Sequence, residues 1–170
     1  LENQEAVLAL SRQGILLSLK GKRDGQEHLS KVKRLSRIAY GAEDSNGKLI
    51  EQQAEAIKCE PLGQNLYRLS YDGLAQTEVD LRITPSGQYF VFSIQAVRQL
   101  PNSVRAIVLF EVNTKHIAQS DSQWARQAAQ DTLFIHALSD NAGVISAPWP
   151  YRAWATPWYP LQGAKFIGSA

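Results

Sequence analysis

The sequence predicts an all-β domain, an antiparallel β-sandwich with one short helix. Three observations indicate this fold. Short runs of alternating or continuous apolar residues recur along the chain and give about nine or ten strands. Turn signals that contain glycine separate these runs at hairpin spacing. One segment near the C-terminal third has the apolar spacing of a helix. A chain of 170 residues builds one core, so residues 1–170 are predicted to form a single domain.

The N-terminal segment predicts a hairpin. Alternating residues over 7–12 form its first strand, Gln13-Gly14 makes the turn, and residues 15–20 return. Asp24-Gly25 gives a second turn signal of the kind that accepts a positive φ angle.

The next segment is ambiguous over residues 49–57, because its apolar residues also match one face of a helix. The residues that follow favour strands, with a hairpin turn at 62–65 and a second turn at Asp72-Gly73. We therefore predict strands over 54–60 and 65–72.

One further hairpin and one further strand are expected in the middle of the chain. Val79, Leu81 and Ile83 alternate with polar residues, and the turn Pro85-Ser86-Gly87 follows them. Residues 89–97 and 104–112 are apolar at nearly every position, which is typical of strands in the interior of a sheet that are covered on both faces.

The segment SDSQWARQAAQDT predicts the helix. Ser120 or Ser122 can cap its N-terminus, and Trp124 shares a face with Ala128 four residues on. Strands are expected again in LFIHAL and AKFIGSA.

Composition excludes several classes of protein. The net charge is +2, and the nearest approach to a basic block is formed by Lys31, Lys33, Arg34 and Arg37, so nucleic acid is not an expected partner. No apolar run reaches the length of about 18 residues that spans a membrane. The single cysteine, Cys59, is expected to be a small buried hydrophobic residue.

One hairpin carries a resemblance to a known family. The stretch SRQGILLSLKGKRDGQEHL resembles the N-terminal β-sandwich domains of bacterial multidomain glycoside hydrolases and polysaccharide lyases, of the galactose-mutarotase-like supersandwich type. The matching positions follow the pattern of a glycine turn, a hydrophobic strand and a G-x-E-x-L turn: Gly14, Leu16, Ser18, Leu19, Lys20, Gly25, Glu27 and Leu29. The resemblance covers roughly the first 115 residues and rests on turn and packing motifs.

This resemblance implies an accessory domain that packs on a downstream catalytic domain of the same chain, with an oligo- or polysaccharide as partner. It implies a periplasmic or extracellular bacterial location. The absence of methionine and the strand-like end KFIGSA favour a piece of a longer polypeptide. A free-standing carbohydrate-binding module and a mutarotase-like sugar epimerase remain alternatives.

Catalytic signals are weak in this chain. No metal-ligand spacing joins His28, His116 and His136, and no cofactor motif is present, so no cofactor or metal site is predicted. In the epimerase alternative, His116 or His136 acts with Glu111. Two other carboxylates, Glu78 and Asp80, share one strand face, and we expect that face to be solvated.

The candidate binding segment is APWPYRAWATPWYPLQG, residues 147–163. Its prolines predict a stiff, kinked loop outside the sheet ladder. Stiff aromatic side chains can stack on a sugar ring, and an arginine can bind hydroxyl or carboxylate groups. Interdomain packing and a local core are the other interpretations. The predicted substrate-binding residues are Trp149, Tyr151, Arg152, Trp154, Trp158 and Tyr159.

Overall fold

The computed structural model describes residues 1–23, 25–114, 119–120, 134–137, 142–147, 152–157 and 165–169. All regular elements of this part of the chain are strands, which confirms the all-β fold class. The strands are β1 (Ala6–Leu10), β2 (Ile15–Gly21), β3 (Leu29–Lys31), β4 (Lys33–Arg34), β5 (Ser36–Glu43), β6 (Leu49–Gly63), β7 (Leu66–Tyr71), β8 (Leu74–Ser86), β9 (Tyr89–Arg98), β10 (Val104–Thr114), β11 (Gln119–Ser120), β12 (Phe134–Ala137), β13 (Ala142–Ala147), β14 (Arg152–Pro157) and β15 (Lys165–Ser169).

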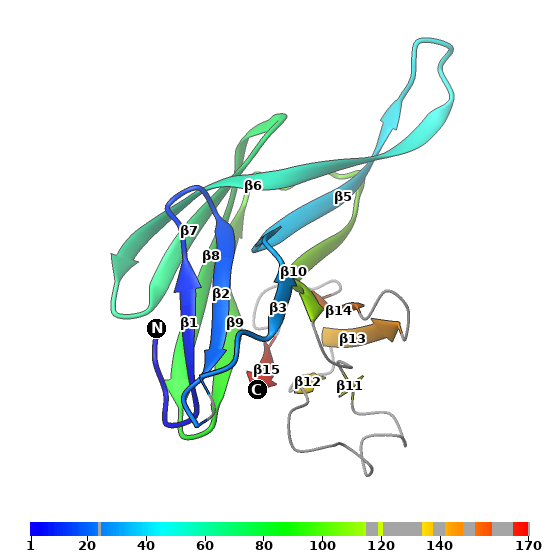
Figure 1. Cartoon of the computed structure of the whole chain (residues 1–170). Coiled ribbons are helices and arrows are strands. Elements are labelled where there is room, and N and C mark those ends of the chain that lie inside the picture. The colour runs from blue at the N-terminus through cyan, green and yellow to red at the C-terminus, as the bar shows by residue number, and fades with distance from the viewer. Residues whose placement is uncertain are drawn as a thin grey trace.

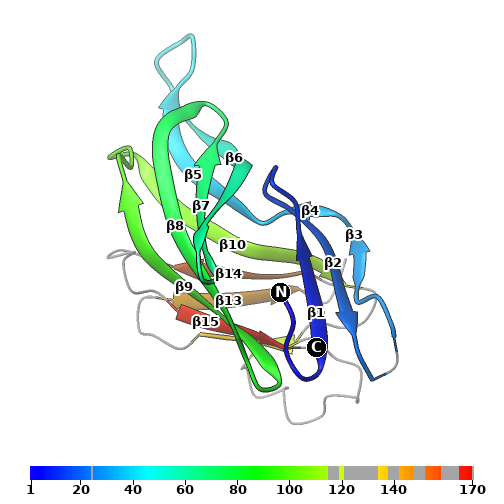
Figure 2. The ribbon, with the colours of Figure 1, turned by 90° about the vertical axis from the view of Figure 1, so that its left-hand side faces the viewer.

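The strands form a small sheet and a large, curled one. The small sheet has the order β1-β2-β4, and the large one has the order β11-β12-β15-β9-β8-β7-β6-β5-β10-β14-β13, with β3 paired to β10. Neighbouring strands are antiparallel, apart from the parallel pair β11 and β12. The two ends of the large sheet curl toward each other (Figure 2). As a result, β12 also lies beside β13 and β14.

The N-terminal hairpin packs against the large sheet. In Figure 1, β1 and β2 stand against β7, β8 and β9. Leu8, Leu16 and Leu19 are at most 1% exposed, and they belong to the same buried cluster as Leu81 and Phe92 of the large sheet. Burying large apolar side chains from both sheets is the main stabilising contribution of a sandwich-like fold.

The predicted turn at Gln13-Gly14 is confirmed. The Ser11 hydroxyl accepts hydrogen bonds from the backbone N–H groups of Gln13 and Ile15, at 3.2 and 3.1 Å. Gly14 adopts a φ of +70°, and a Cβ at this position would lie 3.2 Å from Cβ of Ala56 on β6. The turn therefore requires glycine for both its backbone angle and its close approach to the large sheet.

The ambiguous segment is a strand. Strand β6 runs over 15 residues, so it starts before the predicted range 54–60 and continues past it. It pairs with β5 on one side and with β7 on the other, which overrides the helical propensity of its Glu, Gln and Ala residues. The predicted hairpin turn at 62–65 is present, with positive φ angles at Gly63 and Asn65.

The remaining strand predictions are confirmed where the structure describes them. Val79, Leu81 and Ile83 share the buried face of β8 and have no exposed surface. Strands β9 and β10 have neighbours on both sides, as expected of interior strands. Residues 134–137 and 165–169 are strands β12 and β15. The predicted helix over residues 120–132 lies outside the described residues, except that Ser120 ends β11.

Candidate functional site

A cluster of four charged residues lies across β7, β8 and β9, and two irregularities of the sheet create it. Tyr71 pairs with Leu74 beside the turn, but the next pair is Ser70 with Glu78. Three residues of β8 therefore bulge out between the two pairs. The shifted register places Arg68 of β7 directly opposite Asp80.

A second bulge lies on the other side of β8. Leu81 pairs with Ile94, whereas Asp80 pairs with Ala96, so Gln95 is an extra residue in β9. The Gln95 side-chain amide donates a hydrogen bond to the Ser93 hydroxyl at 2.6 Å. Because one extra residue moves the following side chains to the other face, the bulge places Arg98 opposite Glu78.

The two arginines converge on the Asp80 carboxylate. Arg68 donates from Nε to Oδ1 at 2.9 Å and from Nη2 to Oδ2 at 3.3 Å. Nη2 of Arg98 lies 2.6 Å from Oδ2 of Asp80. Glu78 completes this ion-pair cluster, with its Oε2 3.4 Å from Nε of Arg68 and 3.8 Å from Nη1 of Arg98.

The cluster corrects the expectation of a solvated face. Only 7% of the Asp80 side chain is exposed, whereas 33% of the Glu78 side chain is. The expectation was wrong for Asp80 because the guanidinium groups of Arg68 and Arg98 cover it.

The ion pairs also fix the charge of Asp80. Burial alone would raise the pKa of this carboxyl, but hydrogen bonds from Arg68 and Arg98 outweigh burial, and the pKa is lowered. A glycoside hydrolase needs one protonated carboxyl that acts as a general acid. Asp80 is held ionised between two arginines, so it is suited to stabilising the sheet and not to donating a proton.

A second polar centre explains the family-like hairpin motif. The Glu27 carboxylate accepts hydrogen bonds from the backbone N–H groups of Leu19 and Leu29, both at 3.0 Å. The Ser18 hydroxyl also donates to it. Gly25 has a φ of +67°, which lets the chain turn back toward β2. The serine, glutamate and glycine of the motif therefore have structural roles in this hairpin.

Two further polar residues are buried in the core. The hydroxyl groups of Ser36 and Tyr71 share a hydrogen bond of 2.8 Å between β5 and β7, and burial raises the pKa of Tyr71.

The Cys59 side chain is also buried, and burial raises the pKa of its thiol to about 11. The prediction that Cys59 is a small buried hydrophobic residue is confirmed.

The aromatic segment is partly a strand. Arg152 and Trp154 lie on β14, which pairs with β13 on one side and β10 on the other. The prediction of a kinked loop was wrong for residues 152–157. Prolines flank this strand instead of interrupting it, and Pro157 is its last residue, where a missing N–H disturbs the ladder least. The other four predicted binding residues lie outside the described residues: Trp149, Tyr151, Trp158 and Tyr159.

The residues of the epimerase alternative lie on different strands. His136 is on β12, opposite Ile167 of β15, and Glu111 is on β10. His116 lies outside the described residues. His28 is 4% exposed and its backbone N–H donates to the carbonyl of Leu19. No group of three or more potential metal ligands occurs among the described residues.

Arg34, one of the basic residues near β4, is engaged with the fold. Arg34 donates to the carbonyl of Gln13 at 2.8 Å, and its Nε lies 3.3 Å from Oε2 of Glu55. In the part of the chain that the structure describes, no helix is long and apolar enough to cross a membrane.

Comparisons with known proteins assign no family. No protein-family model matches the chain, and no curated protein matches its sequence. The fold and the arrangement of residues therefore have to carry the functional argument.

Proposed function

We propose that the chain is an accessory β-sandwich domain of a secreted bacterial carbohydrate-active enzyme. The observation that carries this proposal is the N-terminal hairpin. Its motif residues form one unit, in which Leu16, Leu19 and Leu29 are buried and Glu27 joins the two ends. A hairpin of this pattern, packed against a curled antiparallel sheet, is what the resemblance to supersandwich domains leads us to expect.

The proposed role of the domain is to bind carbohydrate and pack on a catalytic domain. Strand β14 supports the binding role, because pairing on both sides holds the backbone of Arg152 and Trp154 in place. An aromatic ring on a fixed backbone loses little conformational entropy when a sugar stacks on it. Arginine N–H groups face both oxygens of Asp80 and only 7% of its side chain is exposed, which disfavours Asp80 as the nucleophile or base of a hydrolase and supports a binding role.

Tryptophan fluorescence tests the binding role. Titration of the protein with a panel of soluble oligosaccharides should change the tryptophan emission for at least one glycan. Trp154→Ala should raise the dissociation constant for that glycan about tenfold or more. Trp124→Ala is the matched control, since Trp124 lies outside the segment 147–163. The binding proposal is wrong if no glycan changes the emission, or if the two variants behave alike.

The packing role has a separate test. The gene that encodes this domain should also encode a catalytic domain, and that domain, made separately, should associate with this one. If the two are encoded together but do not associate, the domain acts as an independent binding module instead.

A further inference from the structure

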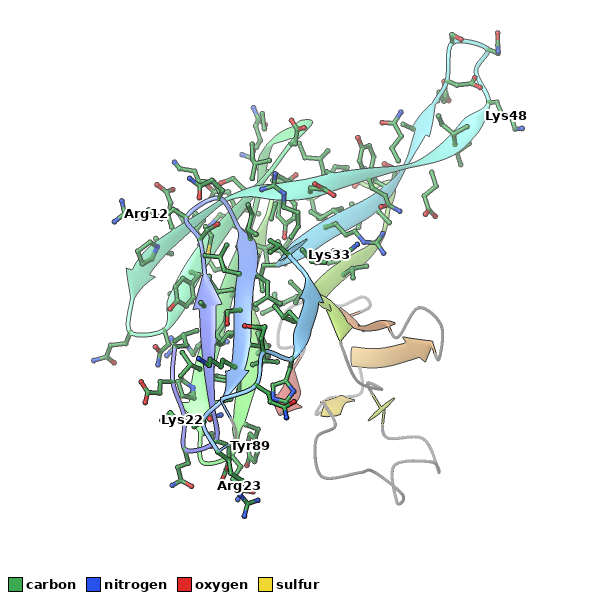
Figure 3. The ribbon with its side chains drawn as sticks, viewed as in Figure 1. Arg12, Lys22, Arg23, Lys33, Lys48 and Tyr89 are labelled. Carbon is green, nitrogen blue, oxygen red and sulfur yellow. The ribbon has the colours of Figure 1, made fainter. Side chains whose placement is uncertain are left out.

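A two-stranded ribbon protrudes from the body of the domain. Figure 1 shows the end of β5 and the start of β6 extending beyond the rest of the sheet, and Figure 3 shows Lys48 at its tip. We call residues 42–53 the arm. Its turn is ordered by Asp44, whose Oδ1 accepts hydrogen bonds from the N–H groups of Asn46 and Lys48, both at 2.9 Å.

The arm leaves the edges of its two strands without a neighbouring strand among the described residues. Strand β10 pairs with β5 only as far as Tyr40, and one more backbone hydrogen bond joins Gly41 to Ser103. On the other side, the pairing of β7 with β6 begins at Ala56. The backbone of residues 49–53 therefore has a strand partner, β5, on one side only.

The arm also exposes apolar side chains. Leu49 is 57% exposed and Ile50 is 36% exposed. Because consecutive residues of a strand point to opposite faces, both faces of the ribbon are apolar at this level. A two-stranded ribbon is only marginally stable in water, and an open edge is a template for another strand.

Charge selects the kind of strand that fits. The arm carries three carboxylates and one ammonium group, a net charge of −2 in a chain whose overall charge is +2: Glu43, Asp44, Glu51 and Lys48. Two copies of the arm paired edge to edge would bring like charges together, which is unfavourable. A basic strand would instead place its cations opposite these carboxylates.

We propose that the arm binds an extended segment of another protein in which basic side chains alternate with apolar ones. The segment adds a strand to the open edge of β6 at residues 49–53. Backbone hydrogen bonds then provide affinity, while Leu49, Ile50 and the carboxylates provide specificity. This inference does not depend on carbohydrate binding.

Amide hydrogen exchange tests the proposal on the whole chain. The probe is a short blocked peptide of alternating lysine and valine, and its counterpart alternates glutamate and valine. The basic peptide should slow exchange of the amides at 49–53 by about tenfold or more, while the acidic peptide leaves them unchanged. Added salt should weaken the effect.

Matched variants distinguish specific binding to the arm from nonspecific binding. Leu49→Ser and Glu51→Lys should each reduce the protection, whereas Leu62→Ser should not, although Leu62 lies on the same strand and is 44% exposed. Absence of protection would overturn the proposal, and so would equal protection by both peptides. Protection that grows with protein concentration alone would identify a second copy as the occupant and would also overturn it.

Discussion

Replacing Asp80 by asparagine tests the account of the ion-pair cluster. The change keeps the size of the side chain but removes the charge that Arg68 and Arg98 contact at 2.9 and 2.6 Å. Loss of a charged hydrogen-bond acceptor costs about 1.5–3 kcal/mol. Because part of each arginine reaches solvent, we expect about 2 kcal/mol of lost stability at Asp80, below the 3–5 kcal/mol typical of breaking a fully buried pair.

The pH dependence gives the same prediction a second readout. The folded-state pKa of Asp80 is lowered, so its stabilising contribution is complete above the unfolded-state pKa of about 3.9 and is lost as the pH falls through the lower folded value. The stability difference between the wild type and Asp80→Asn should therefore be largest near neutral pH. It should shrink as the solution is acidified below about pH 4.

Urea denaturation followed by tryptophan fluorescence measures both effects. Glu55→Gln is the control, because the Glu55 side chain is 58% exposed and its pair with Arg34 is a surface pair worth at most about 1 kcal/mol. The reasoning is refuted if Asp80→Asn stays within about 0.5 kcal/mol of the wild type. It is also refuted if the Asp80→Asn deficit is independent of pH.

Three further predictions concern the hairpin and the core. Gly14→Ala should cost about 1–3 kcal/mol in urea denaturation and more than Gly47→Ala, because both glycines have a positive φ but only Gly14 has a neighbour near the added Cβ. Equal losses would show that the contact with Ala56 is unimportant. Glu27→Ala should cost about 2 kcal/mol by the same assay, since it leaves the N–H groups of Leu19 and Leu29 without an acceptor. A loss under about 0.5 kcal/mol would contradict that role. In a double-mutant cycle, Ser36→Ala and Tyr71→Phe should couple by about 1 kcal/mol, and additive losses would mean that their 2.8 Å hydrogen bond contributes nothing.

The N-terminal hairpin could be predicted from sequence because its signals are local. Glycine at position 14, alternating leucines and the Asp24-Gly25 pair are all read within a few residues of the structure that they form. The confirmed strands β8 and β9 follow from the same local patterns. Strand β6 was ambiguous because its alternation is weak, and only pairing with β5 and β7 decides its conformation.

The ion-pair cluster could not be predicted because it depends on bulges. A regular ladder continued from Tyr71 and Leu74 would place Arg68 opposite Thr77. A regular ladder continued from Leu81 and Ile94 would place Glu78 opposite Val97. The recurrence of charged residues at alternate positions of β8 was the available signal, but it does not reveal the register of the neighbouring strands.

The aromatic segment was predicted in part. Its prolines correctly exclude a helix for residues 152–157, but they also predict an unpaired loop, which is wrong for this strand. Because Pro148, Pro150 and Pro160 lie outside β14, its first five residues can all pair with β13, and three of them also pair with β10. Whether a proline interrupts or flanks a strand depends on which residues pair, and single-residue propensities do not contain that information.

The central claim is that the segment around β14 binds carbohydrate. The most direct measurement is the fluorescence titration with an oligosaccharide panel, on the wild type, Trp154→Ala and Trp124→Ala. We predict a saturable change in emission for at least one glycan. Trp154→Ala should raise the dissociation constant for that glycan about tenfold or more, and Trp124→Ala should leave it unchanged. A flat response across the panel, or an equal response in both variants, would contradict the claim.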